Sequence, residues 1–340
     1  MRRAVVLVTG ASGEMGHGLI EGLAKQGGTD ILALDLQRPI PAVAKHCVAT
    51  LKGDILDTAL LQRIVSEYAV EEIYHLAALL STRAEYTPEM AHHVNVDGTL
   101  NLLKLASEEA RRLDKPVKFL FPSSIAAYGL PDRQTKETVE PLKEHKYNTP
   151  TTMYGCNKLY CEHLGRYFAI HYKQLSESSA RSGVDFRSIR FPGLISAITL
   201  PAGGTSDFAP EMLHAAAKGE PYACFVDEGA RIPFMAMTDG IRAMQLLAQA
   251  PADALTQRVY NVTAFSPTAA QIRERVLQSF PNADITFKRD ERRAAIVDSW
   301  PAEVDDGPAR ADWNWVPEYD ADAVFEYLVP QIRDRYRNNA

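Results

Sequence analysis

The sequence predicts an α/β fold in which a doubly wound parallel sheet is followed by a smaller C-terminal lobe. From residue 5 to about residue 195, short apolar runs rich in β-branched residues alternate with longer amphipathic stretches. That alternation is typical of βα units wound around a parallel sheet. A glycine-rich turn over residues 10–16 joins the first apolar run to the first amphipathic stretch, at the place where such sheets bind ligands.

The individual elements follow from the same alternation. The predicted strands are residues 5–8, 31–34, 72–75, 118–121 and 186–190. The predicted helices between them are residues 15–26, 57–68, 97–112 and 154–172. After Pro192 the chain changes to Gly- and Pro-rich connections, with a short helix over 209–217 and a strand-like segment at 260–263.

Two domains are expected from this change of pattern. The first domain spans residues 1–190 and also includes a returning segment near 236–265. Residues 191–340 form mainly the second, substrate-binding lobe. No repeat or long flexible linker separates them, so the lobes should pack together around a ligand cleft.

Composition limits the class of protein. The 340 residues are 46% hydrophobic and carry 37 basic against 43 acidic side chains, so a soluble protein without a nucleic-acid partner is expected. No stretch is long enough to span a membrane and the apolar run at residues 4–8 is too short for a signal peptide.

The cysteine spacing matches neither zinc binding nor a dense disulfide framework, which favours reduced thiols and a cytoplasmic location. The cysteines are Cys47, Cys156, Cys161 and Cys224.

The turn after the first strand has the G-x-x-G-x-x-G spacing of a dinucleotide site. A pyrophosphate needs close backbone approach and free N–H groups at a helix start, and side chains at Gly10 or Gly13 would obstruct it. Since a strand precedes the motif and a helix follows it, a Rossmann-type cofactor site is more plausible than a plain tight turn.

The second strand ends at Asp35, an acidic residue that can accept hydrogen bonds from both hydroxyls of an adenosine ribose. NAD is therefore the expected cofactor, although the nearby Arg38 leaves NADP or dual use open. Asp54, after the next short strand, either meets the adenine amino group or caps the following helix.

Tyr154 and Lys158 lie four residues apart in a helical segment, so their side chains share one face. A tyrosine base at neutral pH requires its pKa to be lowered by ~3 units, about 4 kcal/mol. One ammonium at about 4 Å supplies up to ~4 kcal/mol at an effective dielectric of 20. The spacing alone is common on helix surfaces, and only the cofactor turn and the serine-bearing strand end make the pair a catalytic candidate.

That strand end carries Ser123 and Ser124. A hydroxyl here would hydrogen-bond the reacting oxygen of a substrate beside Tyr154. We expect Ser124 to do this, with Ser123 supplying a second hydroxyl or a structural bond.

Taken together, these motifs resemble the extended short-chain dehydrogenases, the group that includes UDP-galactose 4-epimerase. They are residues 10–16, His75-Leu76-Ala77-Ala78, Asn95-x-x-Gly98, Ser123-Ser124 and Tyr154-x-x-x-Lys158. Segments that vary within the group look like the L-threonine 3-dehydrogenases of the short-chain type. Those segments are residues 77–81, 122–126, 149–155, 191–196, 201–207 and 298–301.

The resemblance implies oxidation of the L-threonine C3 alcohol to 2-amino-3-oxobutyrate, with the hydride passing to NAD and the proton to Tyr154. Lys158 would also hold the nicotinamide ribose, and Asn95 would anchor the active-site helix or a proton-relay water. The expected cofactor contacts are Gly10, Gly13, Glu14, Met15, Gly16, Asp35, Asp54, Ile55, Leu76, Ala77, Ala78, Asn95, Ser123, Tyr154, Lys158, Phe191 and Ile195. The expected substrate contacts are Ser81, Ser124, Tyr154, Gly193, Thr205, Ser206, Asp207 and Trp300.

The substrate lobe favours an amino acid over a nucleotide sugar, whose diphosphate calls for Arg or Lys. Residues 191–227 contain Lys218 as their single cation, and residues 203–207 could form a donor nest for a carboxylate with Asp207 facing the ammonium. Against this, Arg231 sits where nucleotide-sugar enzymes often bind a diphosphate, so an epimerase or dehydratase remains the alternative; Arg231 could also be a structural hinge. A non-catalytic NAD sensor would not need Tyr154 and Lys158 together.

Two departures from the family pattern bear on cofactor binding and assembly. Glu14 stands in the phosphate turn, where its carboxylate must point away from a pyrophosphate. The polar stretch 173–183 follows the predicted catalytic helix. In relatives, this helix and the one near 97–112 form the dimer interface. A homodimer is expected from the resemblance, and a monomer is plausible because of this extension. No metal site is expected from His75, His92 and His93.

Overall fold

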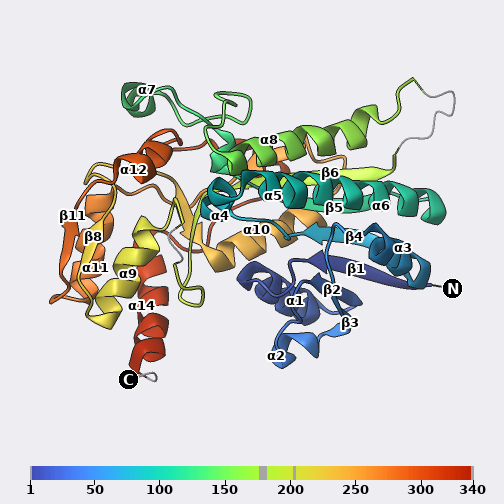
Figure 1. The fold of residues 1–340 in the computed structure, drawn as a ribbon, viewed down its shortest axis with the longest axis horizontal. Coiled ribbons are helices and arrows are strands. Elements are labelled where there is room, and N and C mark those ends of the chain that lie inside the picture. The colour runs from blue at the N-terminus through green and yellow to red at the C-terminus, as the bar shows by residue number, and fades with distance from the viewer. Residues whose placement is uncertain (1, 176–181, 202–203, 338–340) are drawn as a thin grey trace.

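A computed structural model describes residues 2–175, 182–201 and 204–337. At its centre lies a seven-stranded parallel sheet with the strand order β10-β6-β5-β4-β1-β2-β3 (Figure 1). The strands are β1 (Arg3–Thr9), β2 (Ile31–Asp35), β3 (Cys47–Lys52), β4 (Tyr68–His75), β5 (Val117–Ser124), β6 (Val184–Phe191) and β10 (Val259–Asn261). The predicted fold class is confirmed, and the five predicted strands all belong to this sheet.

Helices cover both faces of the sheet, and the strands contribute apolar side chains to a core on each side. On one face, α3 (Thr58–Glu67), α6 (Gly98–Leu113) and α8 (Met153–Arg166) enclose one apolar core with the strands. On the other face, α1 (Glu14–Gln26) and α10 (Met237–Gln249) enclose a second. Figure 1 draws α6 and α8 on one side of the strands and α1 on the other.

Two π-helical turns adjoin α6 and α8. One (His93–Asp97) precedes α6 and the other (Tyr167–His171) follows α8, so the predicted helix over 154–172 is α8 plus this turn. A π-helical turn shifts the register of a helix and often accompanies a functional site. The first turn contains Asn95.

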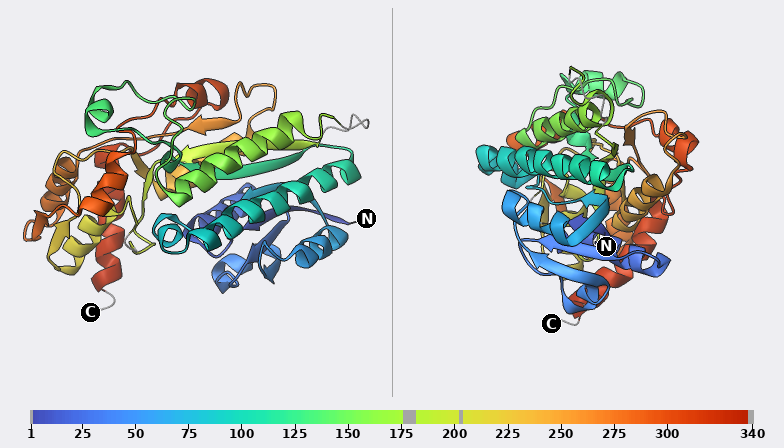
Figure 2. Two further views of the ribbon diagram at one scale, coloured as in Figure 1. Left: turned by 45° about the horizontal axis from the view of Figure 1, so that its top comes forward. Right: turned by 90° about the vertical axis from the view of Figure 1, so that its right-hand side faces the viewer.

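The C-terminal elements enclose a third apolar core, to which residues between 125 and 142 also contribute. The left view of Figure 2 shows these elements at one end of the sheet. These elements are α9 (Phe208–Lys218), β8 (Tyr222–Cys224), α11 (Ala269–Ser279), β11 (Ile285–Phe287), α12 (Glu291–Asp298) and α14 (Ala321–Arg337). A small parallel pair, β7 (Gly193–Ile195) and β9 (Phe234–Ala236), leads from the sheet into the lobe. The division at residue 190 remains a proposal.

In the part of the chain that the structure describes, no helix is both long and apolar enough to cross a membrane. The thiols of Cys47, Cys156, Cys161 and Cys224 are all free.

Candidate active site

The strand ends that carry predicted cofactor contacts lie at one edge of the sheet, because the strands run parallel. Ligands of open α/β sheets bind outside this edge, where the strand order reverses, and here the reversal lies between β1 and β4. Residues that end or follow these strands are Gly10, Asp35, Asp54, Ile55, Leu76, Ala77, Ala78, Ser123, Ser124 and Phe191. Met15 lies in the first turn of α1, and Gly193 and Ile195 are the two ends of β7.

The glycine turn is packed tightly against the loop after β4. Gly10 has a φ of +68°, and a Cβ there would stand 2.6 Å from the Ala77 nitrogen. A Cβ at Gly16 would stand 2.8 Å from the Ala11 carbonyl carbon, so neither position accepts a side chain.

Gly13, by contrast, faces open space at the start of α1. A Cβ there would meet only the Gly10 carbonyl oxygen, at 3.5 Å. No side chain caps α1, so its first N–H groups stay available to an anion. The turn therefore fits a pyrophosphate.

The Asp35 carboxylate is fixed beside this turn. Its two oxygens accept hydrogen bonds from the backbone N–H groups of Ser12 and Gln37, each at 3.0 Å. These bonds orient the carboxylate and leave lone pairs for ribose hydroxyls.

At the end of β3, Asp54 does not cap the next helix. Its carboxylate accepts from the Leu56 N–H at 2.9 Å, whereas Asp57 caps α3 by accepting from the Leu60 N–H at 3.0 Å. The capping alternative for Asp54 is therefore wrong, and a contact with adenine remains the prediction for this residue.

His75 is a buried structural residue. Its ring nitrogens lie 2.9 Å from the hydroxyl oxygens of Thr9 and Thr99. Burial, with a further contribution from the charge of Lys158, lowers the pKa of His75 to about 3. The ring thus stays neutral and joins β1 to α6.

Asn95 ties the loop after β4 to α8. Its amide accepts from the Leu79 N–H at 2.8 Å and donates to the Leu79 carbonyl at 3.0 Å and to the Asn157 side chain at 3.3 Å. Because the amide is engaged in this way, the structure supports the anchoring role more than a direct cofactor contact.

The candidate catalytic pair, Tyr154 and Lys158, lies on α8, which begins at Met153 with Thr152 as its cap. Lys158 is buried, donates to the Pro122 carbonyl at 2.6 Å, and stands 5.4 Å from the centre of the Tyr154 ring. Burial lowers the pKa of Lys158 to about 8, although the nearby Cys161 and Glu162 favour its charged form.

The expected lowering of the Tyr154 pKa is not found. Burial instead raises the pKa of Tyr154, because the surrounding apolar groups disfavour a phenolate. Lys158 directs its ammonium at the Pro122 carbonyl and lies 5.4 Å from the centre of the Tyr154 ring, which does not offset this effect of burial. Forming the phenolate near neutral pH therefore needs additional positive charge beside the ring.

Ser123 and Ser124 point to opposite faces of β5, as neighbours on a strand do. The Ser123 hydroxyl donates to the carboxylate of Glu162, which Arg190 also holds in a buried ion pair at 2.6 Å. This network binds β5, β6 and α8 together and occupies the Ser123 hydroxyl. Sequence reasoning missed Glu162 and Arg190 because their partners are distant in the chain.

The Ser124 oxygen accepts from the Ala126 N–H at 3.1 Å, which starts a short 3₁₀ turn over Ile125–Ala127. That bond leaves its hydroxyl hydrogen available for a ligand. The start of α8 lies against the turn: a Cβ at Gly155 would overlap the Ala126 carbonyl oxygen. Tyr154 and Ser124 therefore lie in adjoining elements, and Ser124 is the better candidate for the reacting oxygen.

From the C-terminal lobe, the Thr205 hydroxyl and the Trp300 indole N–H are both buried and have no hydrogen-bond partner among the described residues. Such groups are costly unless a ligand or water satisfies them. Ser81, at the start of α4 (Ser81–Tyr86), and Ser206 are partly exposed.

The predicted donor nest is only partly described, because Gly203 lies outside the described residues. The Asp207 carboxylate accepts from the Gly204 N–H at 2.6 Å, so it is already engaged within the turn. Arg293, which sequence reasoning missed, donates to the Gly204 carbonyl at 3.2 Å. Asp207, the residue expected to face the ammonium, thus helps to hold the turn together with Arg293.

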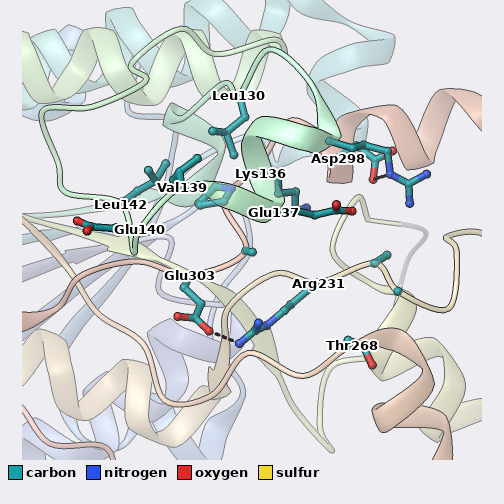
Figure 3. Close-up of a pocket in the computed structure, with 15 residues that line it drawn as sticks. Leu130, Lys136, Glu137, Val139, Glu140, Leu142, Arg231, Thr268, Asp298 and Glu303 are labelled. Carbon is teal, nitrogen blue, oxygen red and sulfur yellow. Dashed lines mark hydrogen bonds and ion pairs between the residues drawn. The ribbon is translucent and has the colours of Figure 1, made fainter.

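Arg231 is held within the C-terminal lobe. Its guanidinium donates to the Ser266 carbonyl at 2.5 Å and pairs with Glu303. Figure 3 shows this pair in a cavity of about 400 Å³ between residues 130–142 and the C-terminal lobe, which Tyr154 does not line. The structural role expected for Arg231 as an alternative is thus the better supported one.

No group of three His, Cys, Asp or Glu side chains that could hold a metal ion occurs within residues 2–175, 182–201 and 204–337. His93 pairs with Asp97 at 2.8 Å instead.

Known proteins resemble this chain over nearly its whole length. A mitochondrial L-threonine 3-dehydrogenase of Sus scrofa is 36% identical over 316 residues, which are 93% of this chain and 79% of that protein. The apo structure of a monomeric L-threonine 3-dehydrogenase from a metagenome database is 35% identical with a TM-score of 0.84, covering 98% of this chain and 100% of its own. The holo form of an L-threonine dehydrogenase of Cupriavidus necator is 35% identical with a TM-score of 0.82, covering 96% and 99%.

The family itself follows from a match to a family model. The model of the NAD dependent epimerase/dehydratase family matches residues 6–263, from the first strand to just beyond β10. The matched region includes the glycine turn, Ser124, Tyr154 and Lys158, and the resemblance inferred from the sequence is confirmed. This chain belongs to the NAD dependent epimerase/dehydratase family.

Proposed function

We propose that this protein oxidises the C3 alcohol of L-threonine to 2-amino-3-oxobutyrate, with NAD as the hydride acceptor. One observation carries the proposal: α8 brings Tyr154 and Lys158 to the turn that follows Ser124, at the same sheet edge as the glycine turn. A base, a cation and a hydroxyl donor at a dinucleotide site are the groups that alcohol oxidation requires.

The roles follow from the contacts of each residue. The N–H groups at the start of α1 and the Asp35 carboxylate would hold NAD, which accepts the hydride removed from the alcohol carbon. Ser124 donates a hydrogen bond to the substrate oxygen, and Tyr154 takes its proton. Lys158 holds the nicotinamide ribose and favours the phenolate.

Neutral polar groups from the C-terminal lobe favour an amino acid as the substrate. The Thr205 hydroxyl and the Trp300 N–H, which have no hydrogen-bond partner in the described part of the chain, can donate to a carboxylate without a cation. Arg231, the residue that favoured a nucleotide sugar, is engaged with Glu303. The named relatives are also threonine dehydrogenases.

The proposal is tested by mixing the purified protein with NAD and L-threonine and following the absorbance of NADH. Steady growth of NADH, faster with L-threonine than with L-serine, supports it. Conversion of UDP-glucose to UDP-galactose without NADH release, and no reaction with L-threonine, would instead identify an epimerase.

We further propose that the protein pairs as a homodimer through α6 and α8. Tyr160 on α8, and Tyr167 and Ile170 on the following π-helical turn, are large apolar side chains between 40% and 54% exposed. Light scattering tests this: a dimer that Ile170→Asp dissociates is expected, and a monomeric parent protein contradicts it.

A further inference from the structure

The Glu14 carboxylate, which departs from the expected phosphate turn, is directed at the segment after β7. One of its oxygens accepts from the Ser196 hydroxyl and the other from the Thr199 hydroxyl. Glu14 opens α1, immediately after Gly13. Its negative charge is thus engaged by two donors from a different part of the chain.

Ser196 also organises its own segment. Its side-chain oxygen accepts from the N–H groups of Ile198 at 2.9 Å and Thr199 at 3.3 Å. Residues 196–199 are therefore turned around the hydroxyl that bonds Glu14. Losing the Glu14 contact would free this turn on the side that faces the phosphate site.

The opposite side of the segment is held by the C-terminal lobe. Arg335 on α14 donates to the carbonyls of Ala197 and Ile198. His214 on α9 lies 3.3 Å from the Ser196 carbonyl through one ring nitrogen and 2.8 Å from the Tyr336 hydroxyl through the other. The segment is thus clamped between the cofactor turn and the lobe.

The position of this clamp gives it a functional consequence. Residues 196–199 directly follow Ile195, an expected cofactor contact, and lead toward Thr205, whose buried hydroxyl lacks a partner among the described residues. We therefore expect a shift of residues 196–199 to disturb Ile195 on one side and Thr205 on the other.

We propose that Glu14 is a positioning residue that latches residues 196–199 to the phosphate turn and so couples the cofactor site to the substrate site. A carboxylate suits this role because it accepts from two hydroxyls at once, in charge-assisted bonds stronger than neutral ones. The competing explanation is that Glu14 only stabilises the N-terminus of α1 by its charge. The inference rests on the proposed function for its kinetic consequence but not for the contact itself.

The contact is tested first in the protein alone, by hydrogen–deuterium exchange. In Glu14→Ala, the peptide containing the Ile198 and Thr199 amides should exchange about tenfold faster than in the parent. Glu14→Gln should restore slow exchange, because its amide can accept from Ser196 and donate to Thr199. Glu21→Ala, at an exposed position of α1, is the matched control and should leave this peptide unchanged.

The kinetic consequence is tested with the same variants. The KM for L-threonine should rise about tenfold in Glu14→Ala and in Ser196→Ala, with kcat within about twofold of the parent, and the double variant should be no worse than either. Glu14→Gln should return to the parent value within about twofold.

The outcomes separate the two proposals. Unchanged exchange at residues 196–199 in Glu14→Ala overturns the latch, as does a loss of thermal stability without any change in KM. If the parent protein does not oxidise L-threonine, the proposed function fails while the exchange result still decides whether the latch exists.

Discussion

The Lys158 ammonium donates a hydrogen bond to the Pro122 carbonyl, 2.6 Å away at the end of β5. It also lies 4.5 Å from the centre of the Phe121 ring. The ammonium is therefore held at the strand edge by a backbone acceptor and an aromatic face, and not by a carboxylate. This arrangement keeps a cation at the site without pairing it to a carboxylate, and burial lowers the pKa of that cation to about 8.

Replacing Tyr154 by phenylalanine removes the proposed base and little else. We expect kcat for L-threonine oxidation to fall by at least about 10³-fold, since general base catalysis contributes 10²–10⁴-fold. NADH binding, measured by fluorescence, should stay within about threefold because the glycine turn is untouched. Residual oxidation within about tenfold of the parent would show that another group takes the proton.

Burial of Lys158 predicts a pH-dependent cost in stability. The pKa falls from 10.5 to about 8 on folding, so between these values the unfolded chain binds more protons and stability rises with pH. Relative to Lys158→Met, the parent should gain up to about 3 kcal/mol in unfolding free energy between about pH 8 and pH 10. Urea unfolding of both proteins across this range measures the difference.

The comparison with Lys158→Met cancels the titration of distant groups, provided that both proteins unfold in a single transition. A gap between the two proteins that stays constant with pH would mean that Lys158 keeps its ordinary pKa in the fold. A Lys158 that stays fully charged would agree better with the expectation from the sequence that its ammonium lowers the pKa of Tyr154.

The two adjacent serines should have different effects on catalysis. We expect Ser124→Ala to lower kcat/KM for L-threonine about 10²-fold, because its free hydroxyl donor is the candidate for the reacting oxygen. Ser123→Ala should leave kcat/KM within about threefold, since that hydroxyl is bonded to Glu162. Equal losses in the two variants would contradict this assignment.

Much of the site could be predicted from the sequence because its determinants are local. The glycine turn, Asp35 and the Tyr154–Lys158 spacing each lie at the end of one strand or on one helix. Their relative placement follows from the parallel order of the sheet. Local patterns therefore identified the elements and the edge at which they meet.

What could not be predicted depends on contacts between distant segments. The Ser123 hydroxyl is engaged because Glu162 comes from α8. Arg231 is held by Glu303, 72 residues further along the chain. The pKa of Tyr154 changes in the direction opposite to the expectation, because the extent of burial is a property of the packed lobes. No spacing rule reports these quantities.

The carboxylate of Asp35 should set the preference between NAD and NADP. It is oriented by the Ser12 and Gln37 N–H groups, and it would repel a 2′-phosphate while accepting from two ribose hydroxyls. In Asp35→Asn one carbonyl oxygen remains for the Ser12 N–H, so the turn should persist while the charge is lost. We expect the ratio of kcat/KM for NAD to that for NADP to fall at least about tenfold, through a higher KM for NAD and a lower KM for NADP.

Steady-state kinetics with both cofactors at saturating L-threonine measures the ratio. A parallel loss with both cofactors would indicate damage to the turn, and an unchanged ratio would mean that another residue, such as the exposed Arg38, determines the preference.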